Sequence, residues 1–134
     1  MKIMVVDAQG GGVGRQLVTE LKKTLPDAEI RAVGTNSAAT AAMLKAGADI
    51  AATGENAVIV GARSADVIVG PIGIVVADSL YGEITPAMAA AIGACSGKRV
   101  LIPINHCDNI IAGVPDLNLG HLVAAAVKEI EALA

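Results

Sequence analysis

The chain has 134 residues, 54% of them hydrophobic and 17% charged, which suits one folded domain over residues 1–134 and excludes a disordered chain. Its formal net charge is −3, with no run of Lys or Arg and only one aromatic residue, Tyr81, so nucleic acid is a poor candidate partner. The longest apolar run, 67–77, is too short to cross a bilayer, and two cysteines without a secretory signal indicate a cytoplasmic protein with no membrane partner.

The hydrophobic pattern alternates between strands and helices along the chain. Short apolar runs predict strands at 3–6, 29–33, 49–52, 67–69 and 100–104, with a further short strand at 109–112. Amphipathic or alanine-rich stretches predict helices at 13–25, 38–46, 55–63, 74–80, 85–95 and 117–133, although 57–60 also suits a strand. This order favours an α/β fold: a doubly wound, mostly parallel, Rossmann-like sheet of about five strands with helices on both faces.

The predicted core contains no Phe or Trp. Ile, Val, Leu and Ala bury less area per residue than aromatic side chains, and burial stabilises by roughly 25 cal/mol per Å² of apolar surface. Subunit association would add to that stabilisation, so we expect a homo-oligomer.

A glycine-rich loop separates the first strand from the first helix. It contains Gln9, Gly10, Gly11, Gly12, Val13 and Gly14, followed by Arg15. The free N–H groups and the dipole of a helix that starts near Val13 favour an anion, and Arg15 supplies a positive charge in the first turn. A plain strand-to-helix turn needs one or two glycines rather than four, so a phosphate or other small anion is the preferred interpretation.

Two named phosphate motifs fit this loop imperfectly. The dinucleotide fingerprint has a third glycine where this chain has Arg15, and no acidic residue follows the second strand to bind a ribose. The Walker A motif has Gly, Lys and Ser or Thr where this chain has Gln9, Arg15 and Gln16. The loop therefore favours a passive phosphate or nucleotide site over a magnesium-assisted NTPase. NAD is disfavoured, and flavin mononucleotide remains open because it needs no such acid.

The loops after the other strands meet the glycine loop at one edge of a parallel sheet. Their candidate binding residues are Thr35, Asn36, Ser37, Thr53, Asn56, Gly70, Pro71, Ile72 and Asn105. One of the three residues at 35–37 could instead cap the second helix.

Three residues are candidates for catalysis. Glu55 is the first candidate for a general acid or base, although a carboxylate at a helix start is also favourable without any catalytic role. Asp7 ends the first strand, where it is a second candidate, or holds a backbone turn or a metal. Cys107 is a candidate nucleophile beside His106, but neighbours on an extended chain point to opposite sides. Asp78 and Glu83 are either site groups or, as the preferred interpretation, solvated residues that flank Tyr81. The spacing of Cys95, His106, Cys107 and Asp108 predicts no metal site.

Four motifs resemble, in order and spacing, a family of short, uncharacterised bacterial proteins known as a domain of unknown function. They are DAQGGG at 7–12, VGTN at 33–36, TGENA at 53–57 and GPIGI at 70–74. Asn105 and Cys107 also match the family, whereas Cys95 does not. The resemblance implies a cytoplasmic bacterial protein with a Rossmann-like fold, and it implies no activity.

The leading hypothesis is a binding protein for a nucleotide or phosphorylated metabolite, whose anion lies in the Gly10–Gly14 loop. The alternatives are a lyase, isomerase or hydrolase of a small phosphorylated substrate at the same site, or a regulatory subunit that binds a protein partner through 70–77.

Overall fold

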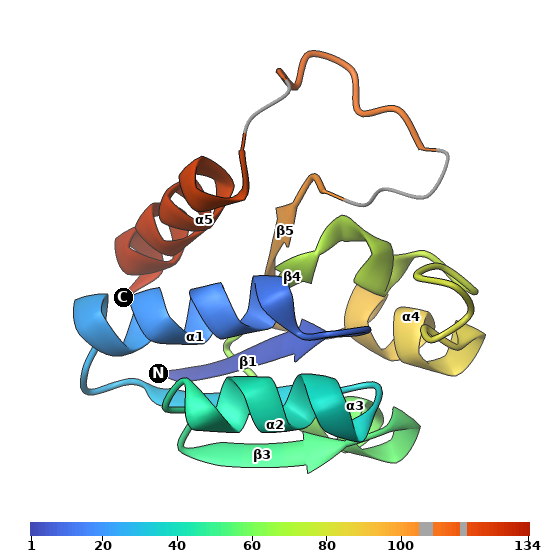
Figure 1. Ribbon diagram of the computed structural model, residues 1–134, viewed down its shortest axis with the longest axis horizontal. Coiled ribbons are helices and arrows are strands. Elements are labelled where there is room, and N and C mark those ends of the chain that lie inside the picture. Colours follow the sequence, from blue (N-terminus) through green and yellow to red (C-terminus); the bar gives the residue numbers. More distant parts are fainter. Residues whose placement is uncertain (105–108, 116–117) are drawn as a thin grey trace.

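Five parallel strands form one sheet through the centre of the molecule (Figure 1). The structure, a computed structural model, describes residues 1–104, 109–115 and 118–134. The strand order is β3-β2-β1-β4-β5, and every described pair of neighbours is parallel. The strands are β1 (Lys2–Asp7), β2 (Glu29–Gly34), β3 (Ile50–Thr53), β4 (Val67–Pro71) and β5 (Lys98–Ile102). The structure thus confirms the predicted fold class.

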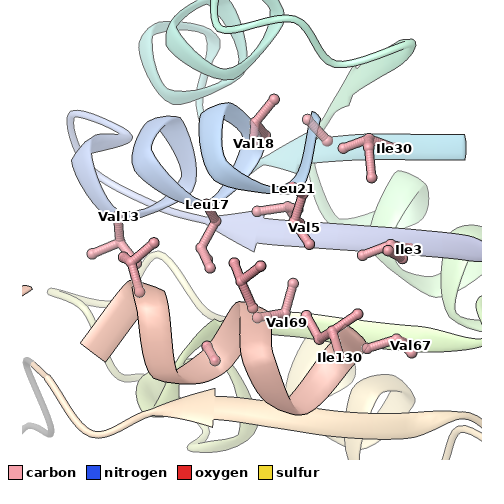
Figure 2. Packing of buried hydrophobic residues seen from close by; sticks show 14 of the residues in the cluster. Ile3, Val5, Val13, Leu17, Val18, Leu21, Ile30, Val67, Val69 and Ile130 are labelled. Carbon is pink, nitrogen blue, oxygen red and sulfur yellow. The ribbon is translucent and has the colours of Figure 1, made fainter. Parts of the chain in front are cut away.

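Helices cover both faces of the sheet. One buried cluster joins α1 (Gly12–Thr24), α2 (Ser37–Lys45) and α5 (Leu119–Leu133) to one face. A second cluster joins α3 (Glu55–Ala62) and α4 (Pro86–Gly93) to the opposite face. Figure 2 shows the first cluster, in which Leu17 of α1 and Ile130 of α5 lie over Val69 of β4.

The continuous apolar run of β1 follows from its central position. Ile3 and Val5 contribute to the α1 and α5 cluster, whereas Met4 and Val6 contribute to the α3 and α4 cluster. Successive side chains of a strand point to opposite faces, so a strand that is covered on both faces needs apolar residues at every position.

The order of the strands reverses next to β1. The chain moves outward from β1 through β2 to β3, returns across the sheet to β4 on the other side of β1, and ends at β5. The carboxyl ends of β1 and β4 therefore lie side by side at the topological switch point, where doubly wound folds bind their ligands.

Two predicted elements were wrong. Residues 74–80 do not form a helix: a short 3-10 helix, η1 (Ile72–Val75), gives way to turns in which Asp78, Leu80 and Tyr81 have positive φ. Left-handed residues are incompatible with a continuing right-handed helix, and the apolar pattern reflects burial of Ile74 and Leu80 without helical geometry. Residues 109–112 form no strand, and Ile110 is 93% exposed there, so it lacks the packing that a strand needs.

Among the described residues, no helix combines the length and the apolar composition needed to cross a lipid bilayer.

Candidate functional site

The carboxyl ends of β1 and β4 border a cavity of about 230 Å³. Polar backbone from the β1–α1 loop forms one wall, and apolar side chains form the rest. The lining residues are Asp7, Ala8, Gln9, Gly10, Gly11, Gly12, Val13, Pro71, Leu80, Ile104 and Leu119. The structure therefore brings six of the predicted binding residues together around this cavity: Gln9, Gly10, Gly11, Gly12, Val13 and Pro71.

The β1–α1 loop leaves two of its N–H groups available to a ligand. The Gly11 amide donates to the Ala8 carbonyl at 3.0 Å, and the Gln9 amide donates to Glu83 Oε1, also at 3.0 Å. Gly10 and Gly12 make no amide hydrogen bond within the described part of the chain, and both residues are exposed. Gly12 is the first residue of α1, so its N–H carries part of the positive end of the helix dipole.

The glycines of this loop divide into two kinds. Gly11 has a φ of 75°, and a Cβ there would lie 2.9 Å from the backbone of Ala39. A Cβ at Gly14 would overlap the Met43 sulfur, so the packing of α1 against α2 requires both of these glycines. At Gly10 and Gly12, by contrast, a Cβ would meet nothing within 4 Å, and neither residue has a positive φ. The fold itself does not require glycine at these two positions.

Asp7 is buried and fixes the loop. Its Oδ1 accepts a hydrogen bond from the Ala8 amide at 2.8 Å, and its Oδ2 accepts one from the Gly14 amide at 2.6 Å. Burial raises the pKa of Asp7, hydrogen bonds from the backbone of Gly14, Ala8 and Val13 oppose that rise, and the charge of Glu83 adds to it. These contacts match the turn-holding alternative for Asp7, and its catalytic role stays a prediction.

Glu83 lies at the centre of a polar cluster that the sequence did not indicate. Its Oε1 accepts hydrogen bonds from the Gln9 amide at 3.0 Å, Thr35 Oγ1 at 2.6 Å and Asn36 Nδ2 at 2.7 Å. Glu83 is therefore half-buried and not fully solvated, because the chain between η1 and α4 folds over the ends of β1 and β2. No motif marked this residue; only the position of Gly82 beside it signalled a turn.

The residues after β2 serve the fold as well as this cluster. Asn36 accepts a hydrogen bond from the Ala39 amide at 2.9 Å and so caps α2, as one of the two interpretations of 35–37 expected. Asn36 also donates to the Gln9 carbonyl at 2.9 Å, which ties the two loops together. Ser37 is exposed as the first residue of α2 and does not line the cavity.

The candidates after β3 lie apart from the cavity. The hydroxyls of Thr53 and Thr40 share a hydrogen bond of 2.7 Å, and Glu55 Oε1 accepts one of 2.6 Å from Thr85 Oγ1. Glu55 and Asn56 are exposed at the start of α3. None of these residues lines the cavity, and the role of Glu55 as acid or base stays a prediction.

Three further candidates also lie outside the cavity lining. Arg15 is exposed on α1, one turn beyond the free amides. Gly70 allows β4 to approach β1, because a Cβ there would overlap the Val6 carbonyl, and Ile72 is half-buried at the start of η1.

Asn105 and Cys107 lie outside the described residues, together with His106 and Asp108. Within the ranges that the structure describes, His, Cys, Asp and Glu side chains form no group of three or more that could hold a metal ion.

Comparisons with known proteins give one family and one solved structure. The chain aligns over 97% of its length with 94% of a dodecameric FMN-dependent UbiX-like decarboxylase from Escherichia coli O157:H7, at 16% sequence identity and a TM-score of 0.47. No curated protein matches the sequence. The family described as a domain of unknown function, DUF3842, matches residues 2–134. Because that match spans nearly the whole chain, the protein belongs to the DUF3842 family.

Proposed function

We propose that this protein binds a small phosphorylated metabolite or nucleotide in the cavity at the β1–β4 switch point. One anionic group of the ligand accepts hydrogen bonds from the Gly10 and Gly12 amides. The supporting observation is that these two glycines line the cavity with unused N–H groups, at positions where the fold tolerates a side chain. Close approach of a ligand to the backbone explains glycine at both positions.

The charges around the cavity favour a ligand with a single phosphate. Asp7 lines the cavity and Glu83 touches its Gln9 wall, whereas no Lys or Arg is among the described lining residues. Two free amides can donate to the oxygens of one phosphate, and each further phosphate would bring more negative charge near two carboxylates without a compensating cation among the described lining residues. A nucleoside monophosphate therefore fits better than a triphosphate, which agrees with the absence of a Walker A motif.

We also propose that the chain acts as one domain, in a cytoplasmic homo-oligomer. The support is the core of small aliphatic residues and several large apolar side chains at the surface, among them Leu44 (53% exposed) and Val60 (44% exposed). Such residues are candidates for burial between copies of the chain.

Native mass spectrometry of the freshly purified protein, followed by denaturation and identification of released molecules, tests the proposed function. We expect a phosphorylated small molecule in stoichiometric amount, or stabilisation by monophosphates in a thermal-shift panel of nucleotides and sugar phosphates. A protein that carries no ligand and responds to none of these compounds would contradict the proposal.

A further inference from the structure

Glu83 does not line the proposed binding cavity, but it contacts residues that do. Its Oε1 is 3.0 Å from the Gln9 amide, and its own amide donates to the Leu80 carbonyl at 3.2 Å. Gln9 and Leu80 both line the cavity, and Gly10, with its free amide, follows Gln9 directly. The Gly10 amide, which is the proposed anion position, is one residue beyond the Gln9 amide, and consecutive Cα atoms are about 3.8 Å apart. The Glu83 carboxylate therefore lies within the length of a sugar from the Gly10 amide.

The two oxygens of Glu83 differ in their surroundings. Oε1 accepts all three hydrogen bonds of the cluster, from Gln9, Thr35 and Asn36. Oε2 has no hydrogen-bond partner among the described residues. The described side chains include no buried polar atom without a partner, so Oε2 is open to solvent. A half-buried carboxylate thus keeps one oxygen fixed and offers the other to a donor.

Thr35 provides a second acceptor beside this carboxylate. Its hydroxyl uses its one hydrogen in the 2.6 Å bond to Glu83, so only lone pairs of Oγ1 remain for a ligand. Asn36 has no free donor, because its Nδ2 donates to both Gln9 and Glu83, and its Oδ1 accepts from Ala39 to cap α2. The cluster therefore offers two adjacent acceptors, which match two adjacent hydroxyl donors.

We infer that Glu83 Oε2, with Thr35 Oγ1, binds the vicinal hydroxyls of a ribose on the ligand whose phosphate lies on Gly10 and Gly12. This inference rests on the proposed function and names its ligand class, a ribonucleotide. Dinucleotide-binding folds place an acidic residue after the second strand for the same purpose. This sequence has no acid there, and Glu83 arrives from the segment between η1 and α4 to contact Thr35 and Asn36, the residues that follow β2.

The backbone that carries Glu83 is held in an unfavourable conformation. Leu80, Tyr81 and Gly82 have φ values of 55°, 58° and 82°, and left-handed geometry costs roughly 1–2 kcal/mol for each non-glycine residue. Backbone strain of this kind persists where the surroundings enforce it and concentrates at ligand sites. The hydrogen bonds of Glu83 and the burial of Leu80 and Ile84 supply that enforcement here.

Calorimetric titration of the full chain with inorganic phosphate, AMP and dAMP tests the inference. The wild type should bind AMP at least about tenfold more tightly than dAMP, since a hydrogen bond to a charged group contributes that much. In Glu83→Gln, the amide oxygen still accepts the three cluster bonds, but an NH₂ group replaces Oε2. This variant should fold normally and bind AMP and dAMP equally. Thr35→Ser, which keeps the hydroxyl, should retain the preference for AMP.

The outcomes of the titrations test the ribose contact of Glu83 separately from the anion site at Gly10 and Gly12. Equal binding of AMP and dAMP by the wild type, with phosphate competing for the site, would overturn the role of Glu83 and leave the anion site in place. A preference for AMP that survives in Glu83→Gln would overturn it as well. Failure of phosphate and both nucleotides to bind would overturn the proposed function, and the inference with it.

Discussion

At the scale of single residues, the fold requires glycine at only two of the four glycine positions in the β1–α1 loop. Gly11 and Gly14 satisfy the backbone and the packing of α1 on α2, whereas Gly10 and Gly12 face open space. The excess of glycine that suggested a ligand is therefore confined to two positions. Substitutions at Gly11 and Gly12 therefore distinguish a glycine that the fold requires from one that a ligand would explain.

Gly11→Ala should destabilise the protein by about 2 kcal/mol or more, because it places Cβ at a positive φ and against the Ala39 backbone. Gly12→Ala should change the free energy of unfolding by less than about 1 kcal/mol, since its Cβ meets no neighbour. Urea denaturation of both variants measures the difference. Equal losses would show that the fold requires glycine at both positions.

Glu83 should make stability depend on pH in a defined direction. Burial alone would raise the pKa of Glu83, but hydrogen bonds from Thr35, the Gln9 amide and Asn36 outweigh it and hold the pKa below its usual 4.5. Ionised Glu83 therefore stabilises the fold at neutral pH, and this contribution is lost as the pH falls below 4.5 through the folded-state pKa.

The difference in unfolding free energy between the wild type and Glu83→Gln reports this contribution, together with the part of the raised pKa of Asp7 that the charge of Glu83 causes. The part of the Asp7 effect that comes from burial is common to both proteins. We expect the wild type to be the more stable of the two at neutral pH, with the difference shrinking in acid. A difference that stays constant across this range would show that ionised Glu83 gains nothing from its donors.

At the scale of elements, the segment between β4 and α4 differs most from its prediction. Its apolar residues suggested a helix, but Ile74, Leu80 and Ile84 are buried from a 3-10 helix and successive turns. Tyr81 lies at the exposed tip, with 96% of its surface accessible and a φ of 58°. The segment is thus fixed by its buried residues and not by the aromatic side chain.

Ile84→Ala should cost about 2–5 kcal/mol, as expected for a fully buried aliphatic side chain. Tyr81→Gly should leave stability unchanged or raise it by about 1 kcal/mol, because glycine adopts a positive φ without strain and the tyrosine makes little contact. Thermal denaturation compares the two variants. A large loss in Tyr81→Gly would show that this side chain supports the fold.

At the scale of the whole molecule, the sequence predicted more of the architecture than of the site. Strands such as β1 and β4 were predictable because burial on both faces demands an unbroken apolar run. The glycine loop was predictable because it is local. The hydrogen-bonded cluster around Glu83 was not predictable, since its residues 9, 35, 36 and 83 are distant in the sequence and no local pattern encodes their contacts. Glu55 and Thr53 lie apart from the cavity, because β3 lies at the edge of the sheet and is separated from β4 by both β2 and β1.

The prediction of one domain in a homo-oligomer also belongs to this scale. Because one five-stranded sheet spans most of the chain, urea unfolding should follow a single transition with the same midpoint by fluorescence of Tyr81 and by circular dichroism. Light scattering coupled to size-exclusion chromatography should give a mass that is a multiple of 13.3 kDa. Two separated transitions would contradict the single domain, and a monomeric mass would contradict the oligomer.

The central claim is that the Gly10 and Gly12 amides receive the anionic group of a ligand, and a matched pair of glycine substitutions tests it most directly. Gly12→Val adds a side chain to a residue that lines the cavity, at a position where a Cβ would meet nothing within 4 Å. Gly93→Val makes the same change at an exposed position on α4 where a Cβ also meets nothing within 4 Å. Calorimetric titration with AMP should show binding to the wild type and to Gly93→Val, and loss of binding to Gly12→Val at unchanged folding. Binding of AMP to Gly12→Val with wild-type affinity would contradict the account.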